Sequence, residues 1–276
     1  MRTLVTPFVM LAAVASTMAA GEPLVTVNVV VPTNTTIVVD AKAAAEADAA
    51  AKKAAEKAAR AAAKKRAAQA AAARARSAVV IKQLIADLKT VPGKGYLLGR
   101  TEVTAEQWHA VMTPDVPFVG EGSLPASGIS WDDSEDFIKR LNERNETIAE
   151  GLTFRLPTVK EWRYVCLAGG KGKWGKVPAG AVGHPDNLAW HAGNSGAAKS
   201  AVAQKSPNAW GFYDMHGSVF EWCSDVSPDY GGDFRLRVGG SFRTPLEQCS
   251  AWFSNSANRT FSRYDDQGLR VLAEHR

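Results

Sequence analysis

The sequence predicts an α+β domain of irregular build, preceded by a long alanine-rich helix. Residues 41–76 consist almost entirely of Ala, Lys, Arg and Glu, without Gly or Pro, and these residues are strong helix formers. From residue 91 onward, short amphipathic helical segments alternate with short apolar segments, and long Gly-, Asn- and Pro-rich tracts separate them. That second pattern is typical of an α+β domain with much irregular structure.

The first 20 residues show the order of regions found in a secretory signal peptide. Arg2 precedes a mostly apolar run over residues 4–15, and small residues follow up to Ala20. The run is shorter than the roughly 20 apolar residues that a membrane-spanning helix needs. We therefore expect export of the chain, to the periplasm, the cell envelope or the medium.

Residues 21–40 are predicted to form a short β-rich leader. The β-branched segments 24–31 and 36–39 flank a turn-like break that begins at Pro32. An isolated hairpin is only marginally stable in water. These strands are therefore expected to pair between chains, to dock elsewhere, or to remain a flexible leader.

Residues 41–90 are predicted to form a helical stalk. At 1.5 Å per residue, roughly 45–50 helical residues would extend for about 70 Å. The pattern permits two interpretations, a solvated single helix that acts as a spacer and a weak coiled coil that forms a homo-oligomer. Residues 77–88 add an apolar stripe that would dock on the following domain, and the helix is expected to end at Pro92 and Gly93.

The basic charge of the chain belongs to this helical segment. Residues 41–90 hold twelve Lys or Arg and four Asp or Glu, a net charge of +8, so the rest of the chain carries −3 of the total of +5. The segment contains no aromatic residue, whereas nucleic-acid interfaces combine basic clusters with groups that contact bases. Charge alone gives only salt-sensitive attraction, so nucleic acid is not expected as a partner.

Residues 91–276 are long enough to form a domain with its own core. Thr104 precedes a helical segment and is followed three residues later by Gln, which is a capping-box pattern. Ser130 or Asp132 would cap a second helix, and Thr158 would cap a third. The domain should therefore contain several short helices among short strands.

Three cysteines in an exported chain allow at most one intrachain disulfide and leave one thiol over. Cys223 and Cys249 are the favoured pair. Cys166 lies in an amphipathic helical segment, where a buried, unreactive thiol is expected. The five histidines lack the i, i+4 spacing of a zinc site, and no nucleophile-elbow motif is present, so hydrolytic chemistry is not expected.

Five segments in a fixed order carry a resemblance to a known family. They read GRTEVT at 99–104, FRLPTVKEW at 154–162, GFYDMHGSVFEWC at 211–223, RVGGSF at 237–242 and QGLRV at 267–271. Together they resemble the formylglycine-generating enzyme family, also called sulfatase-modifying factor domains, over residues 91–276. The resemblance implies that family's irregular fold, which is related to C-type lectin domains.

The resemblance also implies an oxidase site. In active members two cysteines bind Cu(I), O₂ is reduced, and a cysteine of an exported sulfatase becomes formylglycine; two soft thiolates suit Cu(I). The family's cysteines lie three and eight positions after the motif serine, here Ser241, and these positions hold Thr244 and Cys249. Cys249 and Ser241 are therefore the implied catalytic residues, with a hydroxyl in place of one thiolate. A structural role for Cys249 is the favoured alternative.

The family resemblance further implies bound calcium. Its members hold this ion through Asn or Asp side chains and main-chain carbonyls, which are the hard oxygen ligands that calcium prefers. Asn187 and the carbonyl of Leu188 match one such place. Copper is expected only if the chain is an active oxidase.

Residues 252–264 are rich in Trp, Asn, Ser and Tyr, which make good recognition surfaces. The predicted ligand-binding residues are Trp252, Asn255, Asn258, Arg259 and Tyr264. We therefore favour a binding or scaffold head on a helical stalk, with a protein or a glycan as ligand. The alternatives are an oxidase that acts on a sulfatase and a purely structural envelope protein.

Overall fold

The structure is a computed structural model that describes residues 25–27, 37–39, 41–178 and 184–276. The predicted signal peptide at residues 1–20 lies outside the described residues. The chain divides into two compact units, Met1–Ala67 and Ala68–Arg276. Within the described residues, no helix is both long enough and apolar enough to cross a membrane.

The two leader strands pair with each other. Strand β1 (Val25–Val27) is antiparallel to β2 (Ile37–Val39), with Val25 opposite Val39. Each of the two strands therefore has the other as its partner, which the sequence did not identify, whereas pairing between chains stays a prediction. Pairing within the chain satisfies backbone groups that an unpaired strand would leave to water.

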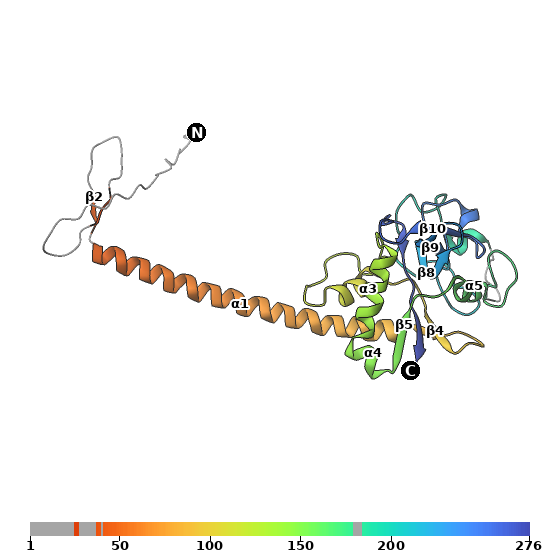
Figure 1. The fold of residues 1–276 in the computed structure, drawn as a ribbon, viewed down its shortest axis with the longest axis horizontal. Helices are drawn as coiled ribbons and strands as arrows, with labels where there is room; N and C mark the ends of the chain where they lie inside the picture. Colours follow the sequence, from red (N-terminus) through yellow and green to blue (C-terminus); the bar gives the residue numbers. More distant parts are fainter. Residues whose placement is uncertain (1–24, 28–36, 40, 179–183) are drawn as a thin grey trace, which may run out of the picture. The chain divides into compact units, whose positions relative to one another are not determined.

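Helix α1 (Ala41–Ala86) runs without a break through the whole alanine-rich segment, as the sequence predicts (Figure 1). It ends at Ala86 rather than at Pro92, because the next residues form strand β3 (Leu88–Thr90), which pairs with β4 (Tyr96–Gly99). The ladder hydrogen bonds of this pair replace those that further helical turns would have made.

The second unit is built on two four-stranded sheets. The first has the order β3-β4-β12-β5, in which β12 (Leu272–His275) lies between β4 and β5 (Leu152–Arg155) and is antiparallel to both. Figure 1 shows the C-terminus at this sheet, beside β4 and β5. The two ends of the unit are therefore joined by strand pairing.

The second sheet has the order β10-β9-β8-β11. Its long antiparallel pair is β8 (Phe220–Ser227) and β9 (Gly231–Val238), whose register shifts between Trp222 and Ser227. Strand β10 (Ser254–Asn258) is an edge strand beside β9, and the two-residue β11 (Gln267–Gly268) runs parallel to β8. A further parallel pair joins β6 (Ala189–Trp190) to β7 (His216–Gly217).

Among the residues that the structure describes, three of the four short α-helices begin with a capping box. Thr104 caps α2 (Ala105–Met112), Ser130 caps α3 (Trp131–Asn142), and Thr158 caps α5 (Val159–Leu167). The predicted caps are confirmed, with Ser130 rather than Asp132 at the second one. The remaining short helix is α4 (Asn145–Ala149), and two 3₁₀ turns cover Pro185–Asn187 and Leu246–Cys249.

Two clusters of buried side chains form the core of the second unit. The first contains Phe137 and Leu141 of α3 together with Ile81 from the last turns of α1. The second contains Trp162 and Val165 of α5, which pack against residues of β4, β9 and β12. The end of α1 is thus part of the core of the unit Ala68–Arg276.

Candidate functional site

The Gly-Gly-Ser turn after β9 forms the place where the family resemblance puts the oxidase site. Gly239 and Gly240 have φ angles of +91° and +76°, a region that favours glycine. A Cβ atom on Gly240 would lie 2.8 Å from Cys249 Sγ. The glycine therefore permits the turn to approach the 3₁₀ turn that carries Cys249.

Ser241 and Thr244 hold this turn together by their own hydrogen bonds. The Ser241 N–H donates to Thr244 Oγ1 (2.9 Å), and Thr244 Oγ1 donates to the Ser241 carbonyl (3.0 Å). The Ser241 hydroxyl donates to Asp266 Oδ2 (2.7 Å). Both hydroxyls therefore have hydrogen-bond partners in the protein, and that of the Ser241 hydroxyl is the carboxylate of Asp266.

Cys249 is a buried thiol beside Thr244. Its Sγ atom lies 3.6 Å from Thr244 Oγ1 and 3.7 Å from the Pro245 carbonyl oxygen. Burial raises the pKa of the Cys249 thiol to about 11, although hydrogen bonds with Thr244 and Ser241 act against this rise. A hydroxyl and a protonated thiol do not make the pair of thiolates that Cu(I) requires, so the residues present here do not fit the copper site of the family.

All three cysteines are free and buried. The predicted disulfide between Cys223 and Cys249 is therefore wrong, since each thiol is enclosed in the core as a small apolar group. Cys166 agrees with its prediction as a buried thiol on α5, with Sγ 3.7 Å from His216 Nε2. Burial raises the pKa of Cys166 and lowers that of His216, so both stay neutral near pH 7.

The second unit also contains a cluster of buried charged side chains, whose members are Glu102, Asp214, Glu221 and Arg270. Arg270 is completely buried and donates to Glu221 at 2.7 and 2.9 Å. It also donates to the carbonyl oxygens of Gly99 (3.0 Å) and Tyr213 (2.9 Å). One oxygen each of Glu102 and Asp214 is buried with no partner. The single positive charge of the guanidinium thus forms an ion pair with Glu221 and also attracts the nearby carboxyl groups of Glu102 and Asp214.

The pKa of Glu102 is raised well above its usual value, first by burial and then by the charges of Asp214 and Glu221. A raised pKa means that the folded protein holds this proton more tightly than the unfolded chain does, so stability is lost as the pH rises through the folded pKa. Glu102→Gln imitates the neutral carboxyl group. We expect it to leave the melting temperature almost unchanged at pH 5 and to raise it relative to the wild type at pH 9.

Thermal unfolding followed by circular dichroism between pH 5 and pH 9 checks this expectation. The matched control is Glu150→Gln, because Glu150 is an exposed carboxylate at the end of α4. If the difference in melting temperature between Glu102→Gln and the wild type stays constant over this pH range, the pKa of Glu102 is not raised.

The predicted calcium residues lie at one 3₁₀ turn. Asn187 ends the turn Pro185–Asn187, its main-chain carbonyl accepts the Ser206 N–H (2.9 Å), and Leu188 is buried. An amide oxygen and a carbonyl oxygen are suitable ligands for calcium. The described residues contain no group of three or more His, Cys, Asp or Glu placed to hold a metal. Calcium at Asn187 and Leu188 stays a prediction.

The structure separates the five predicted ligand-binding residues. Arg259 forms an ion pair with Asp132 of α3, with Nε 2.7 Å from Oδ1. The side chain of Asn258 accepts the N–H groups of Thr260 and Phe261, both at 3.0 Å. These two residues therefore fix the course of the chain after β10, and their polar groups already have partners.

Trp252, Asn255 and Tyr264 are exposed, with 51% of Trp252 and 61% of Tyr264 accessible to solvent. Trp252 lines a surface hollow beside α5, and Asn255 lines a smaller one beside it. The two hollows share Leu236 and Ser254. Trp252 and Asn255 thus belong to one continuous region, which does not include Tyr264.

The larger hollow, which we call the α5 groove, has a volume of about 880 Å³. Its walls come from the chain around β4, from α5, from β8 and β9, and from the residues before and at the start of β10. The residues that line it are Lys94, Tyr96, Thr158, Val159, Lys160, Glu161, Arg163, Tyr164, Leu167, Asp225, Leu236, Trp252 and Ser254.

Most residues of the α5 groove do not appear among the predicted site residues. Lys160, Arg163 and Tyr164 follow the i, i+3, i+4 spacing of one helix face. Three polar or aromatic side chains on the exposed face of a short helix were the signal available in the sequence. Lys94 and Tyr96 gave no such signal, because only the fold brings β4 beside α5.

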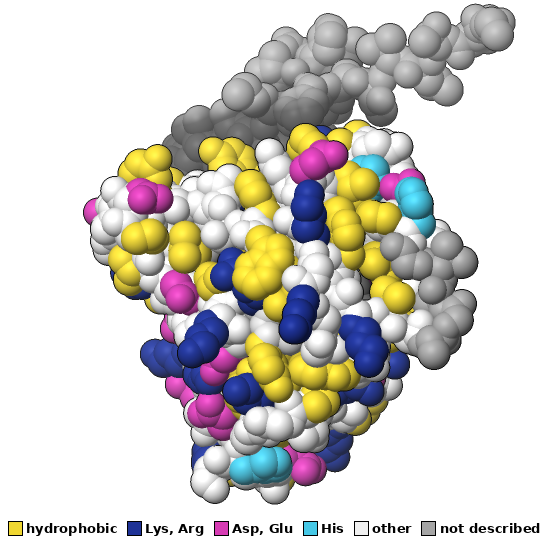
Figure 2. Space-filling model, turned by 90° about the vertical axis from the view of Figure 1, so that its right-hand side faces the viewer, with side chains coloured by type: hydrophobic (Ala, Val, Ile, Leu, Met, Phe, Trp, Pro, Cys, Tyr) yellow, Lys and Arg dark blue, Asp and Glu magenta, His cyan; other side chains and the backbone are white. Residues whose placement is uncertain are grey.

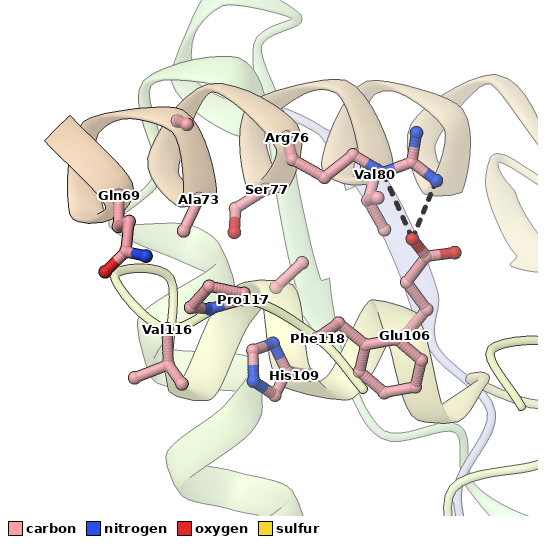
Figure 3. A pocket seen from close by; sticks show the side chains of 12 residues that line it. Gln69, Ala73, Arg76, Ser77, Val80, Glu106, His109, Val116, Pro117 and Phe118 are labelled. Atoms are coloured by element: carbon pink, nitrogen blue, oxygen red, sulfur yellow. Dashed lines mark hydrogen bonds and ion pairs between the residues drawn. The ribbon is translucent and has the colours of Figure 1, made fainter. Parts of the chain in front are cut away.

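A second hollow, of about 430 Å³, lies between the last part of α1 and α2. Figure 3 shows Ala73 and Ser77 of α1 facing His109 of α2 and Pro117 across it. At one end the Arg76 guanidinium donates to Glu106 Oε1 (2.8 Å). Small side chains and apolar contacts dominate this hollow, and it shares no lining residue with the α5 groove.

The irregular fold, the Gly-Gly-Ser turn and the buried Arg270 cluster define a formylglycine-generating-enzyme-like domain of the C-type-lectin-like class. The chain belongs to the family of sulfatase-modifying factor enzyme 1-like domains, which matches residues 67–275. The family assignment made from the five sequence segments is thus confirmed, as is the α+β fold with its preceding helix.

Two curated proteins illustrate the sequence similarity. A protein named Chaperone protein LppX, from Paenibacillus barcinonensis, is 25% identical over 235 residues, which cover 67% of this chain and 82% of the relative. The formylglycine-generating enzyme of Mus musculus is 26% identical over 200 residues, which cover 63% of this chain. The chain spans only 50% of that enzyme's length.

Two solved structures illustrate the similarity in fold. Treponema denticola variable protein 1 superimposes with a TM-score of 0.54 at 27% identity, over 66% of this chain and 84% of its own. PvdO from Pseudomonas aeruginosa gives a TM-score of 0.55 at 22% identity, over 65% of this chain and 80% of its own. The second similarity, at this lower identity, supports the fold alone.

Proposed function

We propose that this domain is a ligand-binding module and that it lacks the oxidase activity of the formylglycine-generating enzymes. The observation that carries the proposal is the contact between Thr244 and Cys249, in which a hydroxyl lies 3.6 Å from a buried thiol at the place of the copper-binding pair. A hydroxyl cannot replace a soft thiolate as a ligand of Cu(I). The open α5 groove, with Trp252 on its wall, supports the binding role.

The test of the oxidase alternative uses a Cys-x-Pro-x-Arg peptide, Cu(I), O₂ and a reductant, with mass spectrometry of the peptide. We expect no conversion of cysteine to formylglycine beside an active formylglycine-generating enzyme. Conversion that disappears in Cys249→Ser would overturn the proposal and make Cys249 and Ser241 catalytic, with a sulfatase as the substrate.

Thr244→Cys provides a second and independent readout. Because Thr244 Oγ1 lies 3.6 Å from Cys249 Sγ, a thiol at position 244 would stand beside the existing one. We expect this variant to take Cu(I) from a chromophoric chelator at about one equivalent, as two thiolates favour this ion, whereas the wild type and Thr244→Ser take up none. Equal uptake by the wild type would contradict the assignment.

We also propose that the chain is exported, because residues 1–20 resemble a signal peptide. Recognition of the ligand would then take place outside the cytoplasm. The similarity to a protein named a chaperone is compatible with a protein ligand, and a lectin-like fold is compatible with a glycan. Mass spectrometry of the protein recovered from its cells tests this proposal. We expect an N-terminus from which residues 1–20 have been removed, and a mature protein that still carries them would contradict export.

A further inference from the structure

Three cations and two carboxylates line the α5 groove, so its lining carries a net charge of +1. Lys94, Lys160 and Arg163 line it, and none of them forms an ion pair within the described part of the chain. The two carboxylates of the groove already have partners. Glu161 pairs with Arg155 (2.7 Å), and Asp225 accepts the Val159 N–H (2.8 Å). The groove therefore favours an anionic ligand.

Two aromatic side chains stand beside these cations. The Arg163 guanidinium lies 5.0 Å from the centre of the Trp252 ring, and the Lys94 ammonium lies 4.6 Å from that of Tyr164. Trp252 and Tyr164 both remain exposed. Figure 2, which faces the side of the molecule where α5 lies in Figure 1, shows Lys and Arg side chains interspersed with hydrophobic ones.

Exposed aromatic rings next to cations suit a ligand that combines flat apolar faces with negative groups. The C–H faces of sugar rings pack on indole and phenol rings, and Trp and Tyr offer such area with little loss of side-chain entropy. The volume of about 880 Å³ lies within the range of roughly 300–1,000 Å³ that is common for small-ligand sites.

Tyr96 supplies an independent observation. Its side chain lines the groove and is 9% exposed, and its hydroxyl is buried without a hydrogen-bond partner among the described residues. Burial, followed by the charge of Glu161, raises the pKa of Tyr96 to about 12, so the hydroxyl keeps its proton. A buried donor without an acceptor is unfavourable, and an oxygen of a bound ligand would satisfy it.

We propose that the α5 groove binds an acidic carbohydrate, a chain of sugar rings that carries carboxylate or sulfate groups. This proposal rests on the binding role proposed above and adds the class of ligand. Lys94, Lys160 and Arg163 meet the negative groups, Trp252 packs against a sugar ring, and Tyr96 donates to a ligand oxygen.

The experiment measures binding of the full chain by isothermal titration calorimetry at physiological salt. The probes are a sulfated heparin hexasaccharide, a hexamer of galacturonic acid, neutral cellohexaose and a poly-glutamate peptide. The first two separate sulfate from carboxylate as the preferred anionic group. We expect at least one of them to bind, and the neutral sugar and the peptide to bind at least about tenfold more weakly.

Two variants that leave the charge of the chain unchanged locate the site. The Lys- and Arg-rich α1 attracts any polyanion, and this attraction is the same in Trp252→Ala, Tyr96→Phe and the wild type. We expect Trp252→Ala to weaken binding of the acidic sugar about tenfold and Tyr96→Phe to weaken it about fivefold. The melting temperature of Tyr96→Phe should stay equal or rise, since the hydroxyl has no partner in the free protein.

Three results would overturn the proposal. Unchanged affinity in both Trp252→Ala and Tyr96→Phe would place binding outside the groove. If neutral cellohexaose binds with the same affinity as the acidic sugars, the cations of the groove do not contribute to recognition. Poly-glutamate that binds as tightly as the acidic sugars, and loses affinity in Trp252→Ala, would make the ligand an acidic peptide. This would overturn the carbohydrate proposal and leave the binding role intact; the oxidase assay separately tests the proposed absence of oxidase activity.

Discussion

Arg270→Met is expected to lower the free energy of unfolding by about 3–5 kcal/mol, because it leaves buried carboxylates without a counter-charge. Arg270 is 0% exposed and Glu221 is 1% exposed. The substitution removes the donors to Glu221 and to two main-chain carbonyls. Since small domains have only about 5–15 kcal/mol of stability in total, the variant should melt far below the wild type or fail to fold.

Urea unfolding followed by circular dichroism measures this loss. The matched control is Arg140→Met, because Arg140 pairs with Asp136 on the surface, where both side chains are about half exposed; an exposed pair contributes less than about 1 kcal/mol. The double variant Arg270→Met with Glu221→Leu should recover part of the loss, because apolar groups can replace a complete buried ion pair. Equal stability of Arg270→Met and Arg140→Met would contradict this role.

Sequence reasoning predicted the features that depend on short spacings. The caps at Thr104 and Thr158 could be predicted because a capping box is a pattern of four residues. The long helix could be predicted because nearly every residue in its sequence favours the helical conformation. Helix propensity did not predict the end of α1 at Ala86. That end depends on the pairing of β3 with β4 and β4 with β12, and the partner strand β12 is far away in sequence.

The site was predicted only in part, for a similar reason. Trp252 was predicted because its segment has the composition of a recognition surface, and it lines the α5 groove, although its role in binding stays a prediction. Thr244 was noticed because the family motif fixes the position at which it stands. Arg259 belonged to the same segment, but its pairing with Asp132 joins residues 127 positions apart. The α5 groove assembles side chains from five separate segments, and no local pattern connects Lys94 and Tyr96 with Trp252.

The family motifs also contain residues whose role is structural. Glu221 and Arg270 belong to two of the five segments that carried the resemblance, and they meet in the buried cluster. The Gly-Gly-Ser turn keeps the backbone arrangement that brings residue 244 to residue 249. The chain thus retains the backbone framework of these motifs, with the hydroxyl of Thr244 beside the thiol of Cys249. The proposed absence of oxidase activity rests on this hydroxyl and not on any change of the fold.

The second prediction concerns the last turns of α1. Val80, Ile81 and Leu84 are 3%, 0% and 4% exposed and belong to the core with α2 and α3. Burial of three such side chains contributes about 5–9 kcal/mol, which is comparable to the whole stability of a domain. We therefore expect a chain that begins at residue 87 to lose cooperative thermal unfolding, whereas a chain that begins at Ala68, the start of the compact unit, keeps it.

A point substitution tests the same contact without shortening the chain. Ile81→Ala should lower the free energy of unfolding by about 2–5 kcal/mol, because it removes buried methyl groups and leaves a cavity. Val79→Ala, two positions earlier on the same helix and 47% exposed, should change it by less than about 1 kcal/mol. If both variants unfold at the wild-type urea concentration, and the chain that begins at residue 87 still melts cooperatively, α1 does not complete the core. A loss of stability confined to Ile81→Ala and the chain that begins at residue 87 means that the folded domain includes the last turns of the alanine-rich helix. Only the part of the helix before Ala68 then lies outside the compact unit.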